Sequence, residues 1–263
     1  MHSINTRTLA LEEVNSEAGI KYAILSHRWE DGEVSHQEML SRAGRSKQGF
    51  NKIRRWCSQA RRDGLGYAWV DTCCIDKKSS AELSEAINSM YRWYKNSNVC
   101  YVFLSDVRAN KPESFSTSQW FTRGWTLQEL LVPENVFFYD QKWEYIGSKH
   151  SLRGDISYIT NIDRNVLSYR NTIHECSIAQ RMSWASQRRT TRTEDRAYSL
   201  MGIFDAHMPL LYGEGDKAFM RLQEEIIRRS DDHSIFAWEY TENDYTIKKY
   251  CHFGVKWPVI LIH

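Results

Sequence analysis

The stretch YAILSHRWED, residues 22–31, shows the pattern that decides the fold. It starts with YAILS, a short apolar run bounded by polar residues, which is typical of a β-strand. The run does not alternate between apolar and polar residues, as a strand with one face in water does. Because a continuously apolar strand is covered on both faces, this run favours a strand of a parallel sheet.

Further apolar runs follow in the first half of the chain: YAWVDTCCI (67–75), VCYVFLS (99–105) and NVFFYD (135–140). Helical periodicity separates these runs. Apolar residues recur at helical spacing over residues 50–60 and 83–94, and Ser79 and Glu82 form a capping box before the second of these segments. Strands that alternate with helices predict a parallel α/β sheet, in which ligands bind beyond the carboxyl ends of the strands.

After about residue 147 the pattern becomes mainly helical. Ser177 and Gln180 are expected to begin one helix. Thr191 and Glu194 form a capping box ahead of a second helix, and a last amphipathic helix follows PLLYGEGD (209–216).

No linker rich in Pro, Gly or Ser separates the two halves, so we expect the second half to pack on the first. The predicted organisation is an α/β core at residues 1–147, a helical extension at 148–240 and a tail at 241–263 to which no structure is assigned.

The composition is that of a globular protein with little overall charge. Hydrophobic residues make up 41% and charged residues 26%, which argues against a largely disordered chain. The formal net charge of +2 indicates no overall electrostatic attraction to nucleic acid. No apolar stretch is long enough to span a bilayer. The six cysteines show no CxxC pair and no metal-ligand spacing, which is typical of a reduced chain, so we expect a cytoplasmic location.

The segment RGWTLQELL (123–131) places a carboxylate beside apolar residues on a predicted helix. Glu129 follows Trp125 by four residues, so the two share a face, and the neighbouring leucines put the carboxylate at the edge of buried surface. Such a group either pairs with a base, for example Arg123, or serves a site. A partly desolvated carboxylate is suited to stabilise positive charge that develops on a sugar carbon, as in glycosidases.

Polar and aromatic residues follow the first predicted strand, at the edge of the sheet where ligands bind. They are Ser26, His27, Arg28 and Trp29. Arg28 is suited to a phosphate and Trp29 to stacking on a ring, although a solvated turn with a buried tryptophan also fits the pattern.

The second predicted strand carries Asp71 and ends before Asp76. A carboxylate at this position often binds a ribose hydroxyl, and the alternative role is to cap the next helix. Two carboxylates without a third neighbouring ligand are a weak metal signal, so we predict no metal site. The basic run SQRRTTRTEDR (186–196) either clamps a pyrophosphate or forms a mixed-charge surface, and its capping box favours the surface.

Several of these segments, in this order, closely resemble the HET domain of fungal heterokaryon-incompatibility proteins over residues 22–227. They are YAILSHRW, YAWVDTCCID, EAINSMYRWY, CYVFLSD, RGWTLQELL, RMSWASQRRTTRTEDRAYSLMGIF and PLLYGEGDKAF. The resemblance implies a cell-death effector that acts when non-self is sensed. HET domains are often joined to a nucleotide-binding switch and a repeat sensor, so the resemblance also implies such a switch or sensor protein as a partner.

HET domains in turn look like distant relatives of TIR domains. The strand in ILSHRWED is similar to the opening strand of TIR domains, and WTLQEL is similar to the TIR helix whose glutamate is catalytic in the TIR enzymes that cleave NAD. The resemblance implies a TIR-like, flavodoxin-like parallel sheet, and it places the catalytic glutamate at Glu129. Thr126 stands where TIR domains usually have a cysteine, and the helical extension has no TIR counterpart.

The resemblance and the residue pattern together predict an NAD(P) glycohydrolase that cleaves the nicotinamide–ribose bond. NAD or NADP is the substrate, and no further cofactor is expected. The predicted site consists of Glu129 as the catalytic carboxylate, with Ser26, His27, Arg28, Trp29, Asp71 and Trp125 as substrate-binding residues.

Because TIR-type sites are commonly completed by self-association, the resemblance implies activity that rises with oligomerisation. The main alternative is a non-enzymatic adaptor that signals death by self-association and recruitment of partners. A metal-dependent nuclease that uses Asp71, Asp76 and Glu129 is a third hypothesis, against which the lack of a basic face argues.

Overall fold

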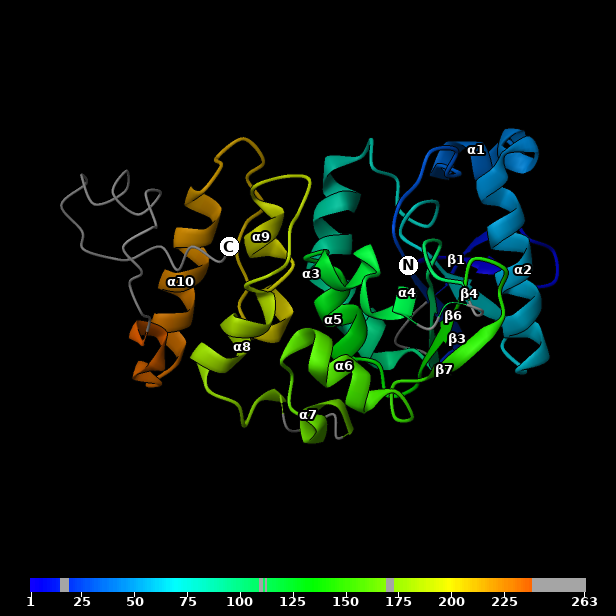
Figure 1. Cartoon of the computed structure of the whole chain (residues 1–263). Helices are drawn as coiled ribbons and strands as arrows, with labels where there is room; N and C mark the ends of the chain where they lie inside the picture. The colour runs from blue at the N-terminus through cyan, green and yellow to red at the C-terminus, as the bar shows by residue number, and fades with distance from the viewer. Residues whose placement is uncertain (15–18, 109–110, 112, 169–172, 238–263) are drawn as a thin grey trace.

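The computed structural model describes residues 1–14, 19–108, 111, 113–168 and 173–237. Its centre is a seven-stranded sheet with the order β2-β1-β4-β3-β5-β6-β7 (Figure 1). The strands are β1 (His2–Asn5), β2 (Leu11–Glu13), β3 (Tyr22–His27), β4 (Tyr67–Trp69), β5 (Val99–Phe103), β6 (Val136–Tyr139) and β7 (Tyr145–Ser148). The predicted α/β class is therefore confirmed.

The middle of the sheet is parallel and consists of the strands that the apolar runs predict, except that the run at 67–75 forms a strand only over Tyr67–Trp69 and turns from Asp71 onward. β3 pairs in parallel with β4 on one side and with β5 on the other, and β5 pairs in parallel with β6. Taken in chain order, these strands are arranged 2-1-3-4, which is the start of the flavodoxin-like order. The order reverses between β3 and β5, and this is where sheets of this type bind ligands.

The remaining strands are antiparallel edges that the sequence pattern did not predict. β1 pairs with β2 and with β4, and β7 pairs with β6. These strands are three or four residues long and mostly half-buried, so they lack the continuous apolar run that marks the central strands. The sheet as a whole is mixed rather than purely parallel.

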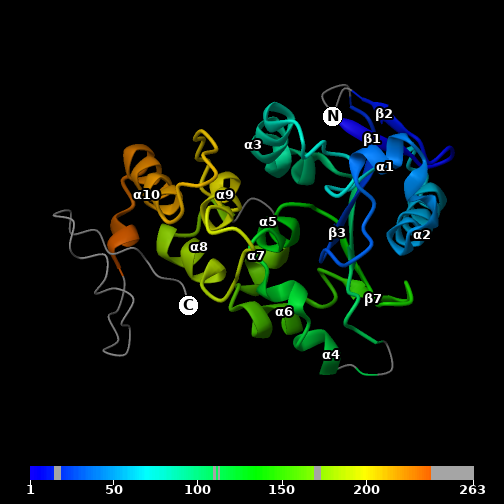
Figure 2. The same cartoon turned by 90° about the horizontal axis from the view of Figure 1, so that it is seen from above.

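Helices cover both faces of the sheet (Figures 1 and 2). α2 (Gln48–Arg62) packs on one face, with the short α1 (His36–Leu40) beside it. α3 (Ser80–Asn96) and α5 (Thr126–Leu131) lie on the other face. The predicted start of α3 is confirmed, because the Ser79 hydroxyl accepts a hydrogen bond from the Glu82 backbone N–H at 3.2 Å.

Aromatic residues make up 13% of the chain, and several of the largest lie in the core. Trp56, Trp69 and Trp120 are among the largest fully buried side chains. Trp69 packs against Trp93 from α3, with ring centroids 5.2 Å apart. Rigid aromatic packing of this kind stabilises the sheet and the helices that hold the site.

The second half of the chain forms the helical extension. Its helices are α6 (Arg153–Thr160), α7 (Arg164–Ser168), α8 (Ile178–Ala185), α9 (Asp195–Tyr198) and α10 (Lys217–Arg229), with short 3₁₀ turns η4 (Met201–Ile203) and η5 (His233–Phe236). α8, α9 and α10 lie beyond α3 and α5, away from the sheet (Figure 1). The shorter segments of the first half are η1 (Ala43–Ser46), α4 (Glu113–Ser116) and η2 (Gln119–Thr122). The predicted tail at 241–263 lies outside the described residues.

Backbone hydrogen bonds join the extension to the segment before α5. The Arg189 N–H donates to the Thr122 carbonyl at 2.6 Å, and the Gly124 N–H donates to the Arg189 carbonyl at 2.9 Å. A side chain at Gly124 would collide with Thr190, because an added Cβ would lie 2.5 Å from the Thr190 methyl carbon. The extension thus lies directly against the start of the helix that carries Glu129.

The two capping predictions in the extension had different outcomes. Ser177 and Gln180 form the expected capping box at the start of α8. The box predicted for Thr191 and Glu194 is wrong, because α9 begins only at Asp195, so Thr191 is not its N-cap, and Glu194 makes no side-chain cap. Its carboxylate instead accepts hydrogen bonds from the N–H groups of Gly213 at 2.7 Å and Gly215 at 3.0 Å. Both glycines have positive φ, as residues of tight turns often do. The Glu194 carboxylate therefore binds the N–H groups of a distant turn instead of capping its own helix.

We expect Gly202→Ala to destabilise the protein by about 1–3 kcal/mol, because a Cβ at this position would overlap the Tyr91 side chain of α3. Thermal or denaturant unfolding measures this change. Gly66→Ala is the matched control, since nothing lies within 4 Å of a Cβ there and the backbone angle is not positive. Equal stabilities of the two variants would contradict close packing of η4 on α3.

Candidate functional site

A pocket of about 270 Å³ lies beyond the carboxyl ends of β3 and β4, on the side of the sheet covered by α3 and α5. The core contributes the ends of these strands, one side of α3 and the start of α5, and the extension contributes the segment before α9. The lining residues are His27, Trp29, Asp71, Ile75, Lys77, Leu83, Ile87, Met90, Arg123, Gly124, Trp125, Thr126, Glu129, Arg189, Thr190, Thr191, Arg192, Asp195 and Tyr212.

Glu129 lines this pocket from a helix that is buried along its whole length. Its side chain is 8% exposed. The Ser26 hydroxyl, at the end of β3, donates a short hydrogen bond to Glu129 Oε2. Ser26 Oγ in turn accepts a hydrogen bond of 2.8 Å from the indole N–H of Trp120. The chain Trp120–Ser26–Glu129 therefore fixes one oxygen of the carboxyl group.

Burial dominates the electrostatics of this group and raises the pKa of Glu129 from 4.5 to about 8. Hydrogen bonds from Ser26 and Tyr94 and the charge of Arg123 oppose the shift, while Asp71 adds to it. Within the described residues no base lies close enough to form an ion pair with Glu129. The alternative of an ion pair with Arg123 is therefore not formed, and Arg123 acts on Glu129 only through its charge. The carboxyl group remains free to act at the pocket wall.

Two further predicted residues meet at the mouth of the pocket. The indole N–H of Trp29 donates to Asp71 Oδ2 at 2.9 Å. Lys77 Nζ lies 3.4 Å from the centroid of the Trp29 ring, which is 44% exposed. A cation therefore covers one face of the ring that we expected to stack on a ligand, and a ligand would use the other face or displace Lys77.

The other predicted residues at the end of β3 and just after it have different surroundings. His27 lines the pocket, but it is buried, and Nε2 lies 3.3 Å from Glu33 Oε1. Burial and the Lys52 cation lower the pKa of His27 despite the opposing effect of Glu33, so the ring is neutral at neutral pH.

Ser26 and Arg28 do not face the pocket as we expected. Ser26 is completely buried beneath Glu129 and is absent from the lining. Arg28 is exposed and also lies outside the lining. The reason is that successive residues of an extended segment point in opposite directions, so not every residue after a strand reaches the same cavity.

Trp125 lines the pocket as predicted, at the start of α5. It lies near Asp195, whose carboxylate accepts a hydrogen bond of 2.9 Å from the Tyr212 hydroxyl. Burial raises the pKa of Asp195, and the hydrogen bonds from Tyr212 and Trp125 oppose that shift. Asp195 and Tyr212 are therefore pocket residues that the sequence pattern did not single out.

The basic run that we expected at the surface has mixed surroundings. Arg189 and Arg192 are exposed and line the rim of the pocket, where the Arg192 guanidinium lies 4.4 Å from the centroid of the Tyr212 ring. Arg196 faces Asp216, with 3.8 Å between Nη1 and Oδ1. Of the two interpretations of this run, a phosphate clamp therefore fits Arg189 and Arg192.

Arg188 is buried and holds α5 in place. Its Nη1 donates to the Arg123 carbonyl at 3.0 Å and to Thr126 Oγ1 at 2.8 Å, and its Nε donates to the Trp184 carbonyl at 3.2 Å. Burial lowers the pKa of Arg188 to about 9, against the attraction of Glu129, so the side chain remains a cation at neutral pH. This arginine links the end of α8 to the first turn of the helix that carries Glu129.

The residues of the nuclease hypothesis are not brought together. Asp76 is not a lining residue, and its carboxylate accepts a hydrogen bond of 3.0 Å from the Lys78 backbone N–H. The pocket has an apolar wall of Leu83, Ile87 and Met90, which belong to the apolar face predicted for the helix at 83–94. Periodicity identifies an apolar face but does not tell whether a core or a ligand covers it.

The geometry defines an α/β domain whose sheet edge and helical extension enclose a pocket with a buried carboxyl group. The family model of heterokaryon incompatibility protein (HET) matches residues 22–115, and that of a domain of unknown function (DUF8212) matches residues 217–253. The chain is 48% identical over 217 residues to vegetative incompatibility protein HET-E-1 of Podospora anserina. These matches identify a HET domain in the chain.

The match to that relative covers 78% of this chain and 16% of the relative, so the chain spans about one sixth of the relative's length. No solved structure gives a significant match. Within the described residues, no helix combines the length and the apolar character needed to cross a bilayer.

We expect Glu129→Gln to stabilise the protein at alkaline pH. The folded pKa of about 8 lies above the ordinary value of 4.5, so between these values the folded state holds a proton that the unfolded state has lost. The stability of the wild type therefore falls as pH rises through this window, and the loss is complete above it. Glutamine has no such proton, so the variant should exceed the wild type by about 1–3 kcal/mol near pH 9 and match it near pH 5.

Thermal unfolding across this pH range measures the difference. Glu85→Gln, which removes an exposed carboxylate of α3, is the matched control and should show no such trend. A Glu129→Gln variant that is less stable than the wild type at every pH would contradict burial of an unpaired carboxyl group.

Proposed function

We propose that this chain is a cell-death effector of fungal non-self recognition and that it cleaves the nicotinamide–ribose bond of NAD or NADP. The HET domain and the vegetative incompatibility protein among its relatives support the effector role. The observation that carries the enzymatic part is a desolvated carboxyl group, Glu129, in the wall of a pocket beyond the carboxyl ends of the parallel strands β3 and β4.

The chemistry needs little beyond a positioned carboxylate. The glycosidic C–N bond breaks with its electron pair moving to the pyridinium nitrogen, so nicotinamide leaves as a neutral molecule. The ribose carbon is left with oxocarbenium character, and water adds to it with loss of a proton to give ADP-ribose. A carboxylate beside the ribose stabilises the developing positive charge, and it acts more strongly in a site that excludes water.

The raised pKa of Glu129 fits a cationic substrate. Without a ligand the carboxyl group is largely protonated at neutral pH, because burial raises its pKa to about 8. A pyridinium ring that enters the pocket favours the charged form of the acid, as a nearby cation does. Binding of the substrate therefore creates the carboxylate that the reaction uses.

The other walls of the pocket suit the other parts of a dinucleotide. Leu83, Ile87 and Met90 offer an apolar surface for a flat ring. Asp71 lines the pocket and would accept a hydrogen bond from a ribose hydroxyl, and Arg189 and Arg192 line its rim, where they would bind phosphates. Ser26 acts through Glu129, whose carboxyl group it orients.

The proposal extends to the setting in which the domain works. A cytoplasmic effector needs a trigger, and a nucleotide-binding switch or sensor protein is the partner that we propose. We also propose that self-association raises the activity, as the resemblance to TIR domains implies. Assays should therefore include high protein concentration and an artificially oligomerised form.

Glu129→Gln is expected to lower kcat/KM for NAD cleavage by about 10³-fold, because an uncharged amide does not stabilise the oxocarbenium ion. Release of free nicotinamide from NAD and NADP by the purified, oligomerised chain measures the activity. Glutamine keeps an oxygen that accepts the Ser26 hydrogen bond, so the fold is expected to be unchanged. Glu85→Gln on α3 serves as the control with wild-type activity.

The same variants separate an enzyme from an adaptor in a fungal cell. If the domain is an enzyme, expression of the wild type depletes NAD and kills, and Glu129→Gln does neither. Normal killing by Glu129→Gln, with NAD unchanged in both strains, would reject the enzymatic proposal and favour an adaptor that acts by recruitment.

The double variant Arg189→Gln, Arg192→Gln is expected to raise KM for NAD roughly tenfold with a smaller effect on kcat, because the two side chains contact the phosphates and not the reacting bond. Steady-state kinetics at low and high salt measure the effect, which should shrink as salt screens the charges. Arg153→Gln removes an arginine of α6 outside the pocket lining and is the control. A loss confined to kcat would contradict this role.

A further inference from the structure

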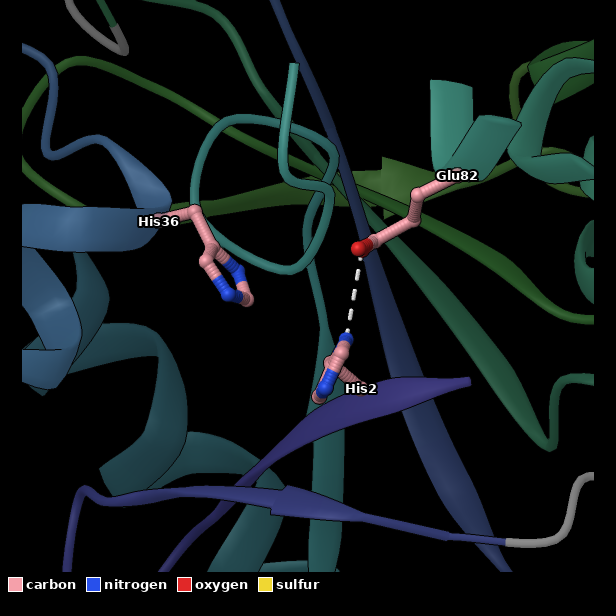
Figure 3. Close-up of side chains that lie close together, drawn as sticks. All are labelled: His2, His36 and Glu82. Atoms are coloured by element: carbon pink, nitrogen blue, oxygen red, sulfur yellow. Dashed lines mark hydrogen bonds and ion pairs between the residues drawn. The ribbon is translucent and has the colours of Figure 1, made fainter. Parts of the chain in front are cut away.

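Three potential metal ligands from distant parts of the sequence meet outside the pocket (Figure 3). They are His2 in β1, His36 in α1 and Glu82 in the first turn of α3. One ligand atom from each of the three lies within 4.8 Å of the others. The rings of His2 and His36 meet edge to face, with centroids 5.0 Å apart.

The surroundings of His36 leave one ring nitrogen free to act as a ligand. Its Nδ1 lies 3.0 Å from the Cys73 carbonyl oxygen. A carbonyl only accepts hydrogen bonds, so Nδ1 carries the proton and Nε2 keeps its lone pair. Metal-bound histidines typically have this arrangement, in which the second nitrogen donates to a carbonyl or carboxylate.

Glu82 is held in a similar way. Its Oε1 accepts a hydrogen bond of 2.9 Å from the Asp76 backbone N–H and lies 3.2 Å from His2 Nδ1. Ligands at about 2.0–2.1 Å from a tetrahedral zinc ion are separated by about 3.3 Å, so the distance between these two atoms already matches one edge of a tetrahedron. Only the His36 side chain needs to move closer.

We propose that His2, His36 and Glu82 form a binding site for a divalent transition metal such as Zn²⁺. Two imidazoles with one carboxylate suit zinc and its neighbours, whereas Mg²⁺ and Ca²⁺ prefer sites made of oxygen ligands. His36 is buried, while the side chains of His2 and Glu82 are 34% and 30% exposed. The fourth coordination position therefore faces solvent and is filled by water.

The metal would join elements that the chain leaves far apart. It connects β1 and α1 to the start of α3, and both hydrogen bonds that support the ligands come from the loop between β4 and α3. That loop also carries Asp71 and Ile75, which line the pocket. A bound ion would thus hold one wall of the pocket in place. The inference does not rest on the proposed NAD cleavage.

Binding of Co²⁺ and Zn²⁺ to the metal-free full chain tests the site. The chain must carry no histidine tag. A tag of another kind must be at the C-terminus, so that His2 keeps its surroundings. We expect one equivalent of Co²⁺ to bind with the intense visible absorption of a tetrahedral ion, and Zn²⁺ to displace it. Zn²⁺ should also raise the melting temperature and slow hydrogen exchange in residues 70–76.

Two variants remove a ligand and keep the hydrogen bonds around it. His36→Asn retains a donor toward the Cys73 carbonyl, and Glu82→Gln retains an acceptor for the Asp76 N–H. Each should weaken metal binding at least tenfold and abolish the cobalt spectrum. His150→Asn, at an exposed histidine elsewhere, should bind like the wild type. Wild-type affinity in both ligand variants, or a wild type without stoichiometric binding, would overturn the proposal.

Discussion

The hydrogen bond from Ser26 to Glu129 is the contact on which the candidate site depends. It joins the end of β3 to α5 and holds a carboxyl group in a position where water does not solvate it. Burial of this group disfavours its charged form, and no ion pair in the described part of the chain offsets that cost. Titratable groups that are buried at such a cost are more typical of functional sites than of purely structural positions.

The helical extension is the second constraint, because it completes the pocket that the sheet begins. Arg188 binds the start of α5 through two hydrogen bonds and the end of α8 through a third, and Arg189 extends the contact through its backbone. The segment that follows supplies Arg192 and Asp195 to the lining. The core by itself would leave Glu129 and Trp125 without the opposite wall, so core and extension form one functional unit.

The loop between β4 and α3 connects the two sites of the molecule. Asp71 and Ile75 face the pocket, while the backbone of Cys73 and Asp76 supports His36 and Glu82. The pocket is lined by side chains of this loop, whereas its backbone groups support His36 and Glu82, so one segment serves both sites. Order imposed at the proposed metal site would therefore reach the pocket through covalent neighbours and would need no long chain of contacts.

The sequence by itself determined the parallel strands β3 to β6, the helices between them and the partly buried carboxylate of Glu129. These features follow from periodicity and from residue types within a few positions, which are local properties. Only the tertiary structure decided what each group meets. It buried Ser26, turned Arg28 outward, drew Glu194 to the turn at Gly213 and brought His2 to Glu82. Such partners lie tens of residues apart, and no local pattern encodes a distance between segments that meet only after folding.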